Sequence, residues 1–174
     1  MQKKPTLITI SSPCQGDEHA LALHLAKEDT FIRSLAEQVK SNASLMTGIG
    51  FSGKEAGSRN QKFFQKFKEA FMELCEGYFV DQMWLEMNCA VRDGVDMIIP
   101  DVQLRYEMER LEEFTKDCGM NLLRIRLINR SVVCGSHREQ REWLELPYDE
   151  VYDSTHSSLE DMKLWAESLR WAGS

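Results

Sequence analysis

The chain has 174 residues, of which 43% are hydrophobic and 28% charged, and its formal net charge is −7. This length suits a single domain over residues 1–174, and the composition is typical of a folded globular protein. No apolar run approaches the roughly 18 residues of a membrane helix, and the negative charge argues against general nucleic-acid binding, because phosphate backbones attract basic surfaces. We therefore expect a cytoplasmic protein without membrane contact.

The five cysteines and four histidines fall in neither a CxxC pair nor an HExxH motif. An odd number of scattered cysteines does not indicate a disulfide framework, and the histidine spacing gives little support to a zinc site. The cysteines are predicted to be reduced thiols.

The predicted elements alternate between strands and helices along the chain. Residues 6–10 form a strand that ends in the loop 11–16, and helical spacing then runs to residue 39 with a candidate break at 27–30, where Asp29 would cap a second helix. Further strands are predicted at 45–51, 96–99, 122–128 and 148–152, and further helices at 63–79, 84–91, 104–118 and 159–169, with Gly119 closing the third of these helices. This alternation indicates an α/β fold with a parallel sheet covered on both faces.

Asp101 stands where the apolar strand 96–99 changes into a charged helix. Open α/β sheets bind their ligands at the carboxyl ends of the strands, so Asp101 could face a metal, a nucleotide or a phosphate-bound water. An aspartate at this position could equally cap the helix that follows it. The spacing leaves both interpretations open.

Several segments taken together resemble a known family. They are the strand, loop and helix of residues 6–27, the element Asp101-Val102-Gln103-Leu104-x-x-Glu107, Arg130, Ser136-His137-x-Glu139, and the carboxyl-terminal run from Leu146 to Asp161. In this order they are similar to the phage-type deoxynucleoside monophosphate kinases. The resemblance implies a three-layer, P-loop-kinase-like α/β fold with a mostly parallel five-stranded sheet, and ATP with Mg²⁺ as cofactors if the protein is active and none otherwise.

The resemblance also implies roles for particular residues. Ser12, Gly16 and Asp17 would line the donor phosphates, with Gln103 nearby, while Asp101 would position magnesium or water and Glu107 would brace its helix. Arg130 and His137 would act in catalysis by closing from the polar segment 129–147, a candidate lid. Lys54 and Arg59 of a second glycine-containing loop could reach phosphates from the same sheet edge, unless that loop is simply solvated.

The departures from the family pattern concern its cations. The family's phosphate loop carries a lysine that neutralises the transferring phosphates, whereas the corresponding stretch here places Asp17 or Glu18 at that position, and Gln103 stands where the family has an arginine. Two functions follow as alternatives. The first is a divergent nucleoside monophosphate kinase that binds a nucleotide or small phosphorylated ligand, with impaired or altered phosphotransfer. The second is a catalytically inactive kinase-fold protein that binds a macromolecular partner, such as another protein.

The phenylalanine-rich helix at 63–79 carries apolar residues on more than one face, for example Phe63, Phe64 and Phe79. A helix that is apolar nearly all round must be buried on both sides. A homodimer through this helix is one prediction, and a fully buried central helix is the other.

Overall fold

The computed structural model describes residues 4–12, 17–48, 58–75, 77–129 and 142–169, with the backbone alone at 58–62 and 65. A five-stranded sheet forms its centre, with strands β1 (Thr6–Ser11), β2 (Phe31–Ile32), β3 (Met97–Ile99), β4 (Asn121–Ile128) and β5 (Glu150–Asp153). The order is β2-β3-β1-β4-β5, and each neighbouring pair is parallel. The predicted α/β fold with a parallel five-stranded sheet is therefore confirmed.

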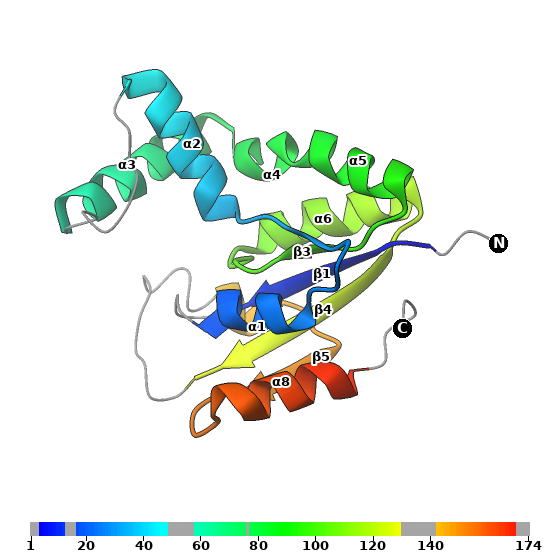
Figure 1. Cartoon of the computed structure of the whole chain (residues 1–174). Helices are drawn as coiled ribbons and strands as arrows, with labels where there is room; N and C mark the ends of the chain where they lie inside the picture. Colours follow the sequence, from blue (N-terminus) through cyan, green and yellow to red (C-terminus); the bar gives the residue numbers. More distant parts are fainter. Residues whose placement is uncertain (1–3, 13–16, 49–57, 76, 130–141, 170–174) are drawn as a thin grey trace.

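Helices cover both faces of the sheet (Figure 1). Helices α4 (Tyr78–Gln82), α5 (Trp84–Asp93) and α6 (Arg105–Cys118) lie on one face, and α1 (Asp17–Leu25) and α8 (Leu159–Ser168) lie on the other. Alternate residues of β1 serve the two layers, because Leu7 belongs to the core beneath α5 and α6 whereas Ile8 belongs to the core beneath α1 and α8. All six residues of β1 are buried, as expected for a central parallel strand.

Helices α2 (Leu35–Thr47) and α3 (Ser58–Leu74) extend away from the sheet (Figure 1). Only three residues of α2 are buried, and all three lie on one stripe: Leu35, Val39 and Ala43. None of the described side chains of α3 is buried. The second prediction for the phenylalanine-rich helix, full burial at the centre of the fold, is therefore wrong.

The region between β1 and β3 differs most from the sequence prediction. The strand predicted at 45–51 is wrong over Leu45–Thr47, because these residues form the last turn of α2. That helix ends at Gly48, whose φ is +67°. Residues 49–51 lie outside the described part. The second strand is instead the two-residue β2, directly after the predicted helix break at 27–30. Ser34, and not Asp29, caps the second helix, since its hydroxyl accepts the Glu37 N–H at 3.2 Å. A short apolar run fits a strand or a helix equally well, and here the helix prevailed.

Other predicted boundaries hold more closely. Strands β3 and β4 lie where the apolar runs place them, and Gly119 ends α6 with φ of +74°, a left-handed conformation that favours glycine. The predicted helix 63–79 is divided, since α3 ends at Leu74 and α4 begins at Tyr78. No helix among the described residues is long and apolar enough to cross a membrane.

The two arginines of β4 make contacts within the protein. Arg124 forms a double hydrogen bond with Asp149, at 3.0 and 2.7 Å, and a 2.8 Å bond with Glu112. Arg126 donates to the Leu146 carbonyl at 2.6 Å and lies 4.0 Å from the ring centre of Tyr148. These contacts tie α6 and the segment 142–149 to the sheet.

Candidate functional site

The candidate site lies at the carboxyl edge of the sheet, where the loops that follow four strands meet. Ser12 follows β1, Asp101 follows β3, Asn129 follows β4 and Ser154 follows β5. Parallel strands end at the same edge, and in open α/β sheets this edge holds the ligand. The topology therefore brings together polar residues at four strand ends, among them Ser12 and Asp101, which the sequence singled out.

Asp17 begins α1 and links this helix to the far half of the sheet. Its Oδ2 accepts hydrogen bonds from Asn129 Nδ2 at 2.9 Å and from Ser154 Oγ at 2.7 Å. Ser154 is further fixed by its own N–H, which donates to the Ile128 carbonyl at 2.8 Å. A carboxylate thus stands at the amino end of α1, the end whose free N–H groups and dipole favour anions. Glu18, the next residue, is buried.

Glu107 holds the start of α6. Its Oε2 accepts the N–H groups of Gln103 at 2.9 Å and Leu104 at 3.0 Å, which is the bracing role expected of this residue. Burial raises the pKa of the Glu107 carboxyl above its ordinary value of 4.5, while Lys68, with Nζ 3.8 Å from Oε1, acts in the opposite direction. The Gln103 side chain in turn lies 3.5 Å from the Ser12 carbonyl, so the β3–α6 loop contacts the loop after β1.

Asp101 caps a helix, but not the one that follows it. Its Oδ1 accepts the Leu35 N–H at 2.9 Å, and its Oδ2 accepts the Ala36 N–H and the Ser34 hydroxyl, each at 2.7 Å. The carboxylate therefore satisfies the free N–H groups at the start of α2. Three hydrogen bonds occupy most of the acceptor capacity of this carboxylate.

The residues named so far carry four carboxylates, on Asp17, Glu18, Asp101 and Glu107, against the single ammonium of Lys68. A hollow of about 310 Å³ adjoins Ser154 and is lined by Asp153, Thr155, His156, Ser157 and Asp161. No group of three or more His, Cys, Asp or Glu side chains among the described residues is placed to hold a metal ion. Protein-bound Mg²⁺ commonly uses one or two carboxylates together with substrate phosphates. Asp101 is the carboxylate at the end of β3, and its hydrogen bonds with α2 already occupy most of its acceptor sites.

Some predicted site residues lie outside the described part, namely Gly16, Lys54, Arg130 and His137. Arg59 lies in the first turn of α3, where the structure describes only the backbone. Of the candidate lid 129–147, the described end is anchored, since Trp143 and Leu146 are buried in the core under α5 and α6.

Sequence reasoning did not select Asn129 or Lys68. Asn129 carried a usable signal, because it is a polar residue directly after the predicted strand 122–128, much as Asp101 follows the strand 96–99. Lys68 carried none, since it lies on the phenylalanine-rich helix and reaches Glu107 only through the tertiary fold.

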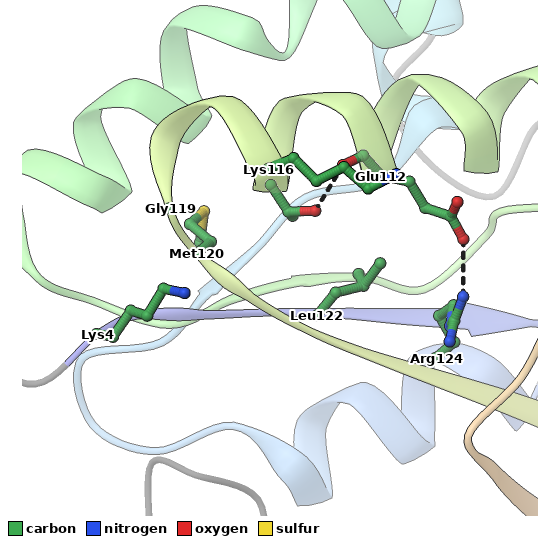
Figure 2. Close-up of a pocket in the computed structure, with 8 residues that line it drawn as sticks. Lys4, Glu112, Lys116, Gly119, Met120, Leu122 and Arg124 are labelled. Carbon is green, nitrogen blue, oxygen red and sulfur yellow. Dashed lines mark hydrogen bonds and ion pairs between the residues drawn. The ribbon is translucent and has the colours of Figure 1, made fainter.

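A second, larger hollow of about 420 Å³ lies at the opposite, amino end of the strands (Figure 2). Lys4 precedes β1, Gly119 follows α6, and Leu122 lies near the start of β4. The Arg124–Glu112 ion pair closes one side of this hollow, as Figure 2 shows. It is separate from the carboxyl-edge site.

No protein-family model and no curated protein sequence matches the chain significantly. Solved structures do match over nearly its whole length. The tunicamycin resistance protein of Deinococcus radiodurans aligns with a TM-score of 0.56 and 18% identity over 94% of both chains. The APS kinase of Mycobacterium tuberculosis, in a Cys-to-Ala mutant, aligns with a TM-score of 0.55 and 7% identity over 94% of this chain and 95% of its own.

A protein of Chloroflexus aurantiacus that is described provisionally as a kinase aligns with a TM-score of 0.59 and 10% identity over 96% of both chains. Identities this low establish only the fold. The chain has a P-loop-kinase-like scaffold.

Proposed function

We propose that this protein is a divergent relative of the deoxynucleoside monophosphate kinases in which ATP-dependent phosphoryl transfer to a nucleoside monophosphate is impaired or altered. The observation that supports this proposal is the Asp17 carboxylate at the start of α1, held by Asn129 and Ser154. In a phosphate loop this end of the helix receives the polyphosphate, and the family supplies a lysine there.

The sign of the charge decides the effect on ATP. Two unit charges about 4 Å apart interact by about 4 kcal/mol at an effective dielectric near 20. Replacing an attraction of this kind by a repulsion of the same kind would weaken triphosphate binding by several kcal/mol. Buried Glu18 adds a second carboxylate beside the first. Binding to a monophosphate would suffer less, because its charge is smaller.

A second function is favoured by a different observation, the exposed apolar side chains on the outer helices. Leu45 and Met46 of α2 are 81% and 66% exposed, and Leu85 of α5 is 75% exposed. Contiguous apolar surface marks sites that bind other macromolecules, and Leu45 and Met46 are neighbours in the chain. The alternative is therefore a catalytically inactive kinase-fold protein that acts by binding a macromolecular partner.

The test is a calorimetric titration of the whole chain with ATP–Mg²⁺ and with each nucleoside monophosphate. We expect weak or undetectable ATP binding by the natural protein and tighter binding after Asp17→Gly with Glu18→Lys. The gain should shrink with added salt, because part of it is screened Coulomb attraction. Adding Gln103→Arg should increase phosphotransfer only if the acceptor site has survived.

A matched control is Asp29→Gly with Glu28→Lys, which makes the same two exchanges in the exposed turn between α1 and β2. This control should leave ATP affinity unchanged. Ordinary ATP affinity in the natural protein would overturn the proposal. If the restored variant is folded and still binds no ATP, the first loop is not a disabled phosphate cradle, and the macromolecule-binding function becomes the better one.

A further inference from the structure

The hollow between α6 and the start of β4 carries more positive than negative charge. Lys4, Lys116 and Arg124 line it, and Glu112 is the one carboxylate among its lining residues. Both lysines are exposed, and neither forms an ion pair with another described residue. The whole chain has a formal net charge of −7, so this excess of cations is local. A hollow lined in this way attracts anions.

Arg124 is held in place at one end of the hollow. Its N–H groups donate twice to Asp149, at 3.0 and 2.7 Å, and once to Glu112, at 2.8 Å. A guanidinium has five N–H groups, so two remain without a partner among the described residues. The two carboxylates offset the charge of Arg124, so it offers directed N–H groups while the lysines supply the net positive charge. A side chain that is already fixed loses little further freedom when a ligand binds.

The floor of the hollow is apolar. Met120 is buried and Leu122 is half-buried, and both belong to the core beneath α5 and α6. Figure 2 shows Leu122 below α6, between Lys4 and Arg124. The volume of about 420 Å³ lies within the range of roughly 300–1,000 Å³ that is usual for small-molecule sites. An apolar floor with cations at its rim fits a ligand that has an apolar body and an anionic group.

The two ends of the hollow differ in how well they suit an anion. Lys4 lies beside Gly119, where α6 ends, and the negative end of the helix dipole offsets part of its charge. Lys116 stands one helical turn after Glu112, which in turn bonds with Arg124. The anionic group is therefore expected at the end of the hollow that Lys116 and Arg124 share.

We propose that this hollow binds a small organic anion, with its carboxylate or phosphate group between Lys116 and Arg124 and its apolar body over Leu122 and Met120. Both kinds of group accept the paired N–H donors that an arginine offers. The hollow lies at the amino end of the strands, away from the carboxyl-edge site, so the inference does not depend on the proposed function.

The test is a nuclear magnetic resonance titration of the whole chain with three probes. Benzoate and phenyl phosphate are the anions, and benzyl alcohol is their neutral counterpart. We expect at least one anion to shift the amide signals of residues 115–124, with a dissociation constant on the order of millimolar, as suits a ligand of this size in an open hollow. Benzyl alcohol should leave these signals in place. The anion that binds more tightly identifies the preferred group.

Charge variants then test which side chains hold the anion. Lys116→Glu should weaken binding on the order of tenfold, because an attraction becomes a repulsion, whereas Lys116→Arg should preserve it. Glu112→Gln removes the lining negative charge, keeps an acceptor oxygen for Arg124, and should tighten binding. Lys40→Glu is the control, since it makes the same exchange at an exposed lysine of α2 that also has no ion pair with a described residue. It should leave binding unchanged.

Circular dichroism confirms that each variant is folded. Signals of residues 115–124 that stay in place with both anions in the tens of millimolar would overturn the proposal, and so would shifts confined to the carboxyl edge of the sheet. Equal shifts with benzyl alcohol, or a Lys116→Glu variant that binds the anions as the natural protein does, would also contradict it.

Discussion

The contact between Asp101 and α2 makes a prediction that can be worked out from the structure. Asp101→Ala removes three hydrogen bonds at once, from the Leu35 and Ala36 N–H groups and from the Ser34 hydroxyl. Loss of a helix cap costs about 0.5–2 kcal/mol, and hydrogen bonds to a charged group contribute about 1.5–3 kcal/mol each. Because the Asp101 carboxylate is only half-buried and water can partly replace it, we expect a loss of about 2–4 kcal/mol.

The assay is urea unfolding followed by circular dichroism, with stability taken from the midpoint at constant m. Asp101→Asn, which keeps one acceptor oxygen, should fall between the natural protein and the alanine variant. Asp93→Ala is the control, since Asp93 is exposed and, among the residues that the structure describes, its side chain is bonded only to its neighbour Arg92. This variant should change stability by less than about 1 kcal/mol.

A double-mutant cycle with Ser34→Ala tests the contact itself. Ser34 donates to Asp101 and also accepts the Glu37 N–H, so the two positions share one network. We expect a coupling free energy of about 1 kcal/mol. An alanine variant of Asp101 that keeps the natural stability, or a cycle without coupling, would refute the reasoning and would leave Asp101 available for a ligand.

Three further predictions concern buried or paired charges. Burial raises the pKa of Glu107 above the unfolded value near 4.5. Between these two pKa values the native state binds more protons than the unfolded state, so the free energy of unfolding falls as pH rises. Glu107→Gln should remove this fall in unfolding curves measured from pH 4 upward. The hydrogen bonds of Arg124 hold the pKa of Asp149 below its ordinary value of 3.8. The stability that the ionised Asp149 contributes is therefore present above pH 3.8 and is lost on acidification. Arg124→Met should flatten the acid side of the curve of unfolding free energy against pH. Arg126→Lys keeps the charge but loses the planar fork and the ring contact, and hydrogen exchange should show protection over 143–148 reduced about tenfold.

The sequence determined the parts of this protein that depend on local patterns. The apolar runs of β1, β3 and β4 and the helical repeat of α6 specify the alternation of strand and helix, and Gly119 marks a helix end through a conformation that other residues avoid. Parallel pairing then follows from short strands separated by helices. The same reasoning placed Asp101 at a strand end, and the family resemblance placed Ser12 and Asp17 in the loop and helix that follow the first strand.

Only the tertiary structure decided which partners these residues have. Asp17 bonds with residues 112 and 137 positions away, and Asp101 caps a helix that begins 66 positions earlier, so no local spacing could indicate either contact. The two-residue β2 has too little sequence to show a period, and its position is set by hydrogen bonds with β3. The periodicity of a sequence indicates which face of a helix or strand is apolar. Which polar partner a side chain such as Asp101 finds depends on how distant segments fold onto one another, and no local pattern in a single sequence indicates that partner.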